Sequence, residues 1–250
     1  MLKIENVEVM GWEAAIRGMR NPMNSWEKSD SNPCAILGEI TDENRLWRCS
    51  GCKNEFVGRP NCTIVGENDL DLMTRLRNAG TDHRKFMRMI TVYLDITAPL
   101  YWWKEFDAYK VGTVANSCST MHKIADKEFT LEDFSCEHLT IRQSMYVLKE
   151  TVNTLNVFRD VYLNGGILRH ENGNRRCFGK KDKEIWWQLI QLLPSSYNQR
   201  RTVMLNYEVL ANIYKSRRNH KLDEWHTFCD WIESLPYSEL IRGVWVSYGK

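Results

Sequence analysis

Residues 98–123, APLYWWKEFDAYKVGTVANSCSTMHK, join an apolar helix pattern directly to a run of small polar residues. Trp102, Phe106 and Tyr109 are spaced i, i+4, i+7, which places them on one face of a helix expected over residues 98–109. The residues that follow are rich in Ser, Thr, Asn and Cys and have no apolar period, so they build no core of their own. The junction therefore predicts a rigid helix followed by a loop whose polar side chains are available to line a binding site.

The composition is that of an ordinary globular protein. The 250 residues are 43% hydrophobic and 26% charged, which suffices for a sizeable core. Lys plus Arg (34) nearly balances Asp plus Glu (32), so the net charge of +2 provides no whole-chain argument for nucleic acid or membrane, and we expect neither as a partner. No signal-like N-terminus and no 18-residue apolar stretch occur, which predicts a cytoplasmic protein.

A segment at about residues 21–66 is rich in Asn, Ser, Pro, Gly and Cys, and we expect a long loop or insertion there. It contains four of the eight cysteines, Cys34, Cys49, Cys52 and Cys62. The CxxC pair has the spacing of a zinc knuckle, but a second CxxC is missing. The pattern leaves a structural zinc site open and favours ordinary reduced thiols, so no metal site is predicted.

Periodicity along the rest of the chain indicates a mixture of helices and strands. Strands are expected over residues 2–9 and 89–95, and helices over residues 11–20, 66–80, 136–162, 181–192, 203–218 and 221–234. Residues 169–183, RHENGNRRCFGKKDK, are polar and basic and are expected to be exposed. Neither a G-x-G-x-x-G motif nor a P-loop occurs, which excludes the two commonest phosphate-binding loops.

The helix expected over residues 203–218 carries a mixed stripe. Asn206, Leu210, Ile213 and Arg217 are spaced i, i+4, i+7, i+11 and share one face. Two interpretations remain open. In one, Asn206 caps a neighbouring helix and Arg217 reaches water, which the pattern alone favours. In the other, the stripe lines a ligand groove, with an amide for a heterocycle and a guanidinium for an anion or a carbonyl.

Together these stretches resemble the flavin-dependent thymidylate synthases over residues 68–235. In that family a helix that often begins Ala-Pro leads into a signature of Arg-His-Arg followed by spaced Ser, Asn, Ser and Arg-Tyr. Farther on, the family's second motif is matched without a gap by Leu193-Pro194, Asn206, Leu210, Asn212 and Arg217. The resemblance implies an α/β (α+β) fold with a mixed sheet and several long helices, as a single domain over residues 1–250.

The first motif departs from the family pattern. The family's Arg-His-Arg corresponds to Ala108-Tyr109-Lys110, its two serines to Thr113 and Cys118, its Asn to Ala115, its Arg-Tyr to Thr120-Met121, and a common Gln to Glu105. Two or three positive charges are therefore absent from a site that binds phosphates in the family. Each charge-assisted contact contributes about 1.5–3 kcal/mol, so we expect thymidylate synthase activity to be weak or absent.

The resemblance also implies ligands and roles. The family uses FAD, methylenetetrahydrofolate and NADPH to convert dUMP to dTMP. By resemblance, the cofactor-binding residues are His83, Tyr109, Lys110, Asn206 and Asn212, the substrate-binding residues are Glu105, Thr113, Cys118 and Arg217, and Arg217 is also the catalytic residue that polarises the pyrimidine. The family builds each site from several subunits, which implies a homotetramer with the aromatic helix over residues 98–109 as an exposed intersubunit surface.

Two other function classes stay open beside this enzyme. The first is a non-catalytic nucleotide- or flavin-binding protein on the same scaffold, which the missing Arg-His-Arg motif favours. The second is a zinc-stabilised interaction protein that docks through the Cys-rich segment.

Overall fold

The computed structural model describes residues 2–33 and 63–243 of the 250-residue chain. Cys34, Cys49, Cys52 and Cys62, at which the sequence leaves a zinc site open, lie outside the described residues. Among the residues that are described, no group of three or more His, Cys, Asp and Glu side chains is placed to hold a metal ion. None of the described helices is both long enough and apolar enough to cross a membrane.

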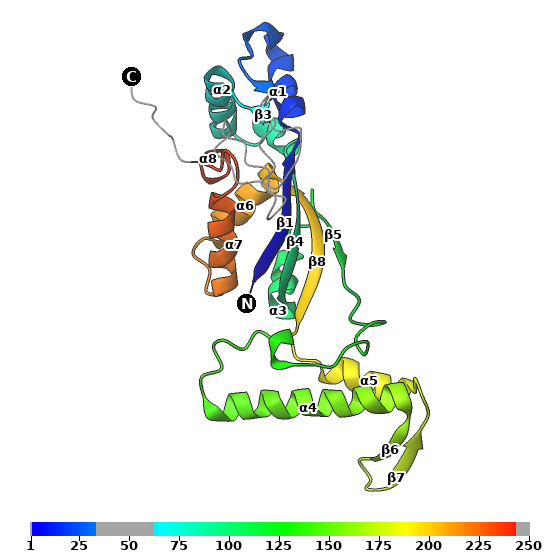
Figure 1. The fold of residues 1–250 in the computed structure, drawn as a ribbon. Helices are drawn as coiled ribbons and strands as arrows, with labels where there is room; N and C mark the ends of the chain where they lie inside the picture. The colour runs from blue at the N-terminus through cyan, green and yellow to red at the C-terminus, as the bar shows by residue number, and fades with distance from the viewer. Residues whose placement is uncertain (1, 34–62, 244–250) are drawn as a thin grey trace, which may run out of the picture. The chain divides into compact units, whose positions relative to one another are not determined.

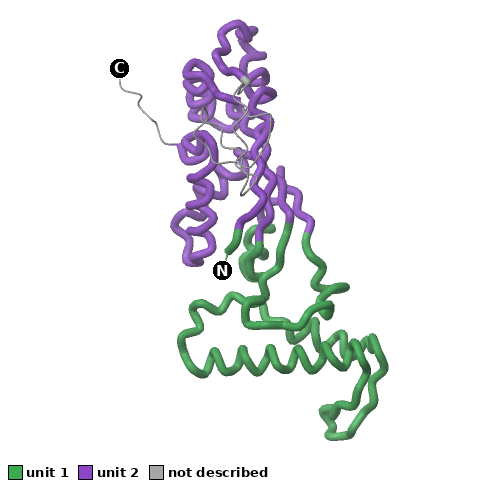
Figure 2. The backbone as a smooth tube through the Cα atoms, viewed as in Figure 1, with its two compact units in different colours: residues 1–3, 97–107, 117–201 green, residues 4–96, 108–116, 202–250 purple. Residues whose placement is uncertain are grey.

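The chain divides into two compact units (Figure 2). Unit 1 comprises residues 1–3, 97–107 and 117–201, and unit 2 comprises residues 4–96, 108–116 and 202–250. The chain passes between the units five times, once between residues 107 and 108 and once within each of the strands β1 (Lys3–Met10), β4 (Thr91–Pro99), β5 (Val114–Ser117) and β8 (Asn198–Asn206). The single domain expected over the whole chain stays a prediction.

One sheet contains the nine-residue strands β4 and β8 and two partner strands. Its order is β1-β4-β8-β5, with β1 at Lys3–Met10 and β5 at Val114–Ser117 (Figure 1). The sequence of β4 alternates, and Val92, Leu94 and Ile96 are at most 1% exposed. Because successive strand side chains point to opposite faces, this period of two buries one face of the strand, as its sequence predicts.

The helices of unit 2 are largely those that the sequence predicts. They are α1 (Trp12–Arg20), α2 (Glu67–Asn78), the 3-10 helix η3 (Arg84–Arg88), α6 (Tyr207–Arg217), α7 (Asp223–Glu233) and α8 (Glu239–Arg242). Helix α6 lies at their centre and packs against η3, α7 and α8. Leu210 and Ile213 of α6 are fully buried, so the apolar part of its stripe is core.

Part of the loop expected over residues 21–66 is regular structure. It contains the 3-10 helices η1 (Asn21–Met23) and η2 (Trp26–Lys28), and β2 (Asn32–Pro33) pairs with β3 (Thr63–Ile64). Buried Asp69 organises this part, because Arg20 Nε donates to it at 2.6 Å and the hydroxyls of Ser29 and Ser31 donate to its other oxygen at 2.6 Å. Local composition predicts a loop here, but a buried charge with three partner residues orders the backbone.

Unit 1 contains the longest helix, α4 (Arg142–Asn164), which packs against α5 (Lys183–Leu192). A short 3-10 helix, η4 (Leu131–Asp133), precedes α4. Their core includes the buried side chains Phe129, Phe134, Leu155 and Leu189. The polar segment between the helices forms a β-hairpin of β6 (Gly166–Arg169) and β7 (Arg175–Phe178), where the sequence predicts only an exposed polar stretch.

The aromatic helix α3 is shorter and more buried than the sequence suggests. It spans Leu100–Phe106, with Pro99 as its N-cap, so Tyr109 lies beyond its end. Trp102, Trp103 and Phe106 are at most 1% exposed within a single chain. The prediction of an exposed aromatic face over residues 98–109 is therefore wrong, because the three rings are buried and pack on one another, with Trp102 stacked on Phe106 and Trp103 edge to face with both.

Candidate functional site

The segment that resembles the family's second motif, residues 206–217, starts at the end of a strand and continues as a helix. Strand β8 continues to Asn206, and α6 begins at Tyr207 rather than near Val203. The Asn206 side-chain oxygen accepts a hydrogen bond from the Val209 backbone N–H at 3.0 Å. Asn206 therefore caps its own helix, which satisfies one of the backbone donors that every helix start leaves without an intrahelical partner.

The loop that follows α3 contacts the N-terminal end of α6. Gly112 has a φ of +79°, and a Cβ atom placed on it would lie 2.9 Å from the Asn206 amide nitrogen and 3.2 Å from Val209 Cγ2. Only a glycine combines this left-handed backbone with so close an approach. The loop backbone therefore touches the helix cap directly.

The same loop contacts the C-terminal end of α6. Arg217 Nε donates to the Tyr109 hydroxyl oxygen at 2.9 Å. Because α6 has 11 residues, these two contacts lie roughly 16 Å apart along its axis. The two segments that the sequence pattern singles out, residues 108–113 and 206–217, thus meet at both ends of α6.

Aromatic rings position the guanidinium of Arg217. It lies over the ring of Trp225 at 4.9 Å and near that of Tyr109 at 5.7 Å, and these two rings meet edge to face. Trp225 is fully buried at the start of α7, whereas Arg217 is half-buried. We call Arg217, Tyr109 and Trp225 the Arg217 cluster. Cation–π attraction and the hydrogen bond to the Tyr109 hydroxyl orient the guanidinium.

A second group of charges lies on the first turn of α6. Glu208 is 6% exposed and pairs with both arginines of η3, Arg84 at 3.3 Å and Arg88. Arg84 also donates to the Asn212 side-chain oxygen at 3.3 Å. Burial raises the pKa of Glu208, but the hydrogen bonds and charges of Arg88 and Arg84 outweigh it and hold that pKa below its ordinary value. We call Glu208, Arg84, Arg88 and Asn212 the Glu208 cluster.

Three further residues of unit 2 that the resemblance implicates differ in their surroundings. His83 is exposed and immediately precedes η3, and Lys110 is exposed in the loop next to Tyr109. The hydroxyl oxygen of Thr113 is buried and makes no hydrogen bond within the part of the chain that the structure describes. Such an oxygen is a site at which a ligand donor or acceptor would replace a missing partner.

Glu105 and Cys118 belong to unit 1. Glu105 is half-buried on α3, and Cys118 is exposed just after β5. The backbone of Cys118 is fixed to β8, because its N–H donates to the Arg200 carbonyl at 2.9 Å and its carbonyl accepts from Gln199. Their assignment to a substrate site stays a prediction.

Sequence reasoning missed two residues of these clusters. Glu208 is the second residue of α6, where acids are favoured by the helix dipole, and it becomes visible once the helix start is placed at residue 207 instead of 203. Trp225 is on the following helix, and no local pattern connects it to Arg217. Its role is evident only from the packing of α7 against α6.

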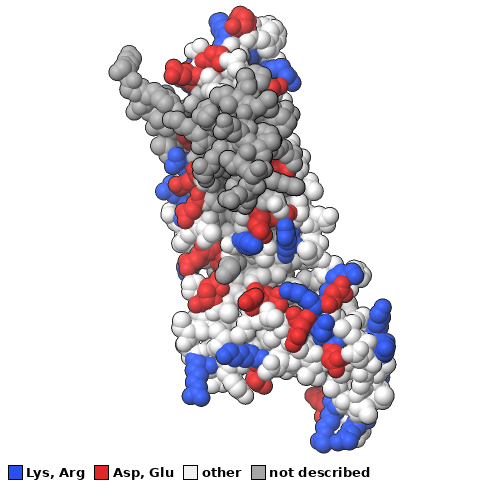
Figure 3. Space-filling model, viewed as in Figure 1, with Lys and Arg blue, Asp and Glu red and all other residues white. Residues whose placement is uncertain are grey.

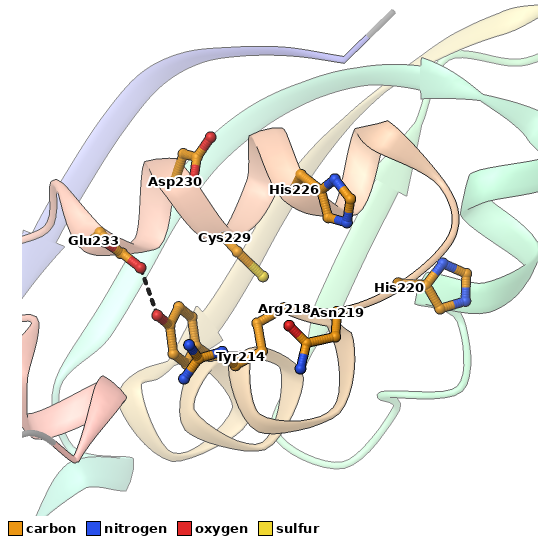
Figure 4. Close-up of a pocket in the computed structure, with 8 residues that line it drawn as sticks. All are labelled: Tyr214, Arg218, Asn219, His220, His226, Cys229, Asp230 and Glu233. Atoms are coloured by element: carbon orange, nitrogen blue, oxygen red, sulfur yellow. Dashed lines mark hydrogen bonds between the residues drawn. The ribbon is translucent and has the colours of Figure 1, made fainter.

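A cavity of about 480 Å³ lies between α6 and α7 (Figure 4). It is lined by Tyr214, Arg218, Asn219, His220, His226, Cys229, Asp230 and Glu233. The Tyr214 hydroxyl donates to Glu233, and burial raises the pKa of the Cys229 thiol to about 11, which keeps it protonated. None of the residues that the sequence pattern implicates lines this cavity.

The arrangement of helices and strands is that of a flavin-dependent thymidylate synthase. The likeness extends to two crystal structures of thymidylate synthase X (ThyX) from Helicobacter pylori with FAD and dUMP. One has a TM-score of 0.58 at 14% identity and covers 96% of both chains. The other has a TM-score of 0.57 at 14% identity and covers 94% of this chain and 96% of that one.

These comparisons establish the fold and stop there. No protein-family model matches the sequence, and no curated protein matches it. With 14% identity to the two structures, the chain has a ThyX-like scaffold, and its ligands and activity have to be argued from its own residues.

Proposed function

We propose that this protein binds a pyrimidine deoxynucleotide at the surface formed by residues 108–113 and helix α6. The observation that carries the proposal is the contact between Tyr109 and Arg217, which joins the two segments that resemble the family's motifs. Helix α3 ends earlier and helix α6 begins later than the sequence predicts, yet residues 108–113 and 206–217 are in contact. The two neighbours of the same fold contain dUMP, which supports a pyrimidine ligand for this scaffold.

Arg217 is the residue we assign to the nucleotide. The rings of Tyr109 and Trp225 hold its guanidinium in one plane, so a planar pyrimidine carbonyl or a phosphate meets a donor that needs little reorganisation. Lys110, exposed beside Tyr109, supplies a second positive charge. A lysine is a point charge on a flexible stem and does not reproduce the bidentate geometry of the family's arginines.

The residues present fit the ring system of FAD better than its pyrophosphate. The Asn206 amide nitrogen, the buried Thr113 hydroxyl and exposed Asn212 provide neutral donors and acceptors along α6. In the proposed cofactor site, Asn206, Asn212 and His83 would hold the flavin, and Tyr109 with Lys110 would face its phosphates. Reduced FAD would supply a hydride, with methylenetetrahydrofolate as the carbon source and NADPH as the reductant.

Binding without turnover is the second candidate, and the Glu208 cluster favours it. Glu208 engages both arginines of η3, so those two guanidinium groups are paired with a carboxylate instead of a phosphate. The family's Arg-His-Arg is Ala108-Tyr109-Lys110. The loss of these charged contacts lowers phosphate affinity by about 1.5–3 kcal/mol for each, so conversion of dUMP to dTMP is slow or absent in this proposal.

Two measurements on the purified protein separate these candidates. The absorption spectrum, with extraction of the bound molecules, reports whether a flavin or a nucleotide is bound. An assay with dUMP, FAD, NADPH and methylenetetrahydrofolate reports turnover. A bound pyrimidine nucleotide with little dTMP formation supports the proposal, whereas rapid dTMP formation shows that other groups replace the missing arginines.

Calorimetric titration of Arg217→Ala tests the site itself. We expect nucleotide affinity to fall about ten- to a hundredfold, or ~1.5–3 kcal/mol, with the fold retained, and Arg217→Lys not to restore it. Arg218→Ala is the matched control, because this exposed arginine is the next residue and lies about 100° around the helix. Equal losses in both variants would indicate a diffuse basic surface, and no nucleotide binding by the unmutated protein would end the proposal.

The homotetramer also stays a proposal. It rests on the resemblance to a family that builds each site from several subunits, whereas the surface expected for it is wrong, since the Trp102, Trp103 and Phe106 rings of α3 are buried within one chain. Sedimentation at micromolar concentration, with and without FAD, decides the oligomeric state, and a monomer under both conditions contradicts the proposal.

A further inference from the structure

The hairpin of β6 and β7 has one buried face and one exposed face. Opposite residues of an antiparallel pair share a face, and the register pairs Arg169 with Arg175 and Leu168 with Arg176. Leu168 packs against the small core of Val161, Phe178 and Ile185, so its face is the inner one. The outer face therefore carries the directly opposed pair Arg169 and Arg175, and both residues are exposed.

The three arginines of the hairpin differ in their partners. On the inner face, Arg176 donates to Glu184 at 2.6 Å and lies over the Phe178 ring at 5.1 Å. Arg169 and Arg175 form no ion pair within residues 2–33 and 63–243. Like charges directly opposite each other destabilise a strand pair. The outer face thus keeps an unfavourable arrangement that a bound anion would relieve.

The positive charge of this region is local. Between residues 166 and 183 the sequence contains six lysines and arginines against two acids, although the whole chain has a net charge of only +2. Beyond β7, the exposed lysines Lys180, Lys181 and Lys183 continue the basic character toward α5. In Figure 3, Lys and Arg side chains gather at the lower right of the view, over the hairpin. The small net charge of the whole chain therefore gives no indication of this local basic surface.

An exposed indole lies on the helix next to the hairpin. Glu184 of α5 accepts from Arg176 and lies 3.1 Å from the His170 ring, which ties the helix to the hairpin. Trp187 follows Glu184 by three residues, so the two share a helix face, and Trp187 is 42% exposed. Neighbouring Trp186 is anchored, because its indole N–H donates to the Met121 carbonyl at 2.9 Å.

We propose that single-stranded nucleic acid binds around the hairpin, with its phosphates on the outer face and a base on Trp187, whose helix face meets the inner face. Arg169 and Arg175 would contact backbone phosphates, and the exposed indole would stack on a base, the combination used by proteins that bind single strands. An anionic membrane fits less well, because the outer face presents one large apolar side chain, Ile167, to insert. The net charge of the whole chain predicts no nucleic-acid partner. The hairpin register changes this expectation, because it places Arg169 directly opposite Arg175.

Fluorescence anisotropy with a labelled oligothymidylate tests the proposal on the full chain. The double variant Arg169→Gln/Arg175→Gln should bind about tenfold or more weakly at about 50 mM salt. Its slope of log affinity against log salt should be shallower by about 1.4, since each phosphate contact on a single strand contributes about 0.7. Trp187→Ala should weaken binding about five- to a hundredfold and leave the salt slope unchanged.

The matched control is Arg142→Gln/Lys149→Gln, which removes two exposed positive charges from α4 in the same unit. The control should bind the oligonucleotide like the unmutated protein. Equal losses in the hairpin and control variants would overturn the proposal. Binding to phosphatidylserine vesicles without binding to the oligonucleotide would overturn it as well.

Discussion

The two charge clusters on α6 hold arginines in opposite ways. Near the start of the helix, Arg84 and Arg88 are held by the buried carboxylate of Glu208. At its end, Arg217 is held by a phenol hydroxyl and two aromatic rings. A carboxylate neutralises the guanidinium that it positions, whereas aromatic rings fix the plane of a guanidinium through cation–π contact. We therefore expect the Glu208 cluster to act mainly on stability, and we propose that the Arg217 cluster acts mainly on ligand binding.

The largest expected effect is the loss of stability in Glu208→Gln. Removing the buried carboxylate leaves its two arginines without their charged partner, and we expect the free energy of unfolding to fall by about 2–3 kcal/mol. Urea denaturation measures it. Arg88→Gln is the control, because the Arg88 side chain is 56% exposed and its loss should cost less than about 1 kcal/mol. Equal losses would show that Glu208 has no special role.

The same variant sharpens the comparison through pH. Because the folded pKa of Glu208 lies below its ordinary value, its contribution to stability is present above the unfolded pKa and is lost as the pH falls through the folded one. The difference in unfolding free energy between the unmutated protein and Glu208→Gln should therefore shrink on acidification below about pH 4.5. A difference that stays constant between neutral and acidic pH contradicts this assignment.

The helix cap offers a test of intermediate size. Asn206→Ala should lower stability by about 1 kcal/mol, because the Val209 N–H loses its acceptor. Asn206→Asp keeps an acceptor at the cap and should retain most of the stability, but it replaces the amide nitrogen that faces Gly112. If flavin binds there, its affinity should fall in both variants. Full flavin affinity in Asn206→Asp would remove Asn206 from the proposed cofactor site.

The smallest expected effect concerns the Tyr109 hydroxyl. Tyr109→Phe keeps the ring beside Arg217 and removes only the oxygen that accepts from Arg217 Nε. We expect stability to be nearly unchanged and nucleotide affinity to fall about threefold, or ~0.6 kcal/mol. Calorimetry on this variant, with Tyr93→Phe as an exposed-tyrosine control, checks it. A loss as large as that of Arg217→Ala would mean that the hydroxyl itself contacts the ligand.

Elements with a clear local period were predictable. Strand β4 alternates along its length, and α2 has acids in its first turn and arginines in its last, so periodicity and helix-dipole preferences locate both. The resemblance of two distant segments also predicted the fold that the structural comparison supports. Strand β4 and helix α2 are each determined by residues close together in the chain.

Other features were decided by tertiary structure, because they depend on residues far apart in the chain. Periodicity places Trp102 and Phe106 on one face of α3 but cannot say whether another layer covers that face, and here it is buried. Residues 203–206 have a helical pattern, yet their backbone pairs in the sheet as the end of β8. Trp225 meets Arg217 only because α7 folds back on α6. Local preferences are worth tenths of a kcal/mol per residue, and non-local burial overrides them.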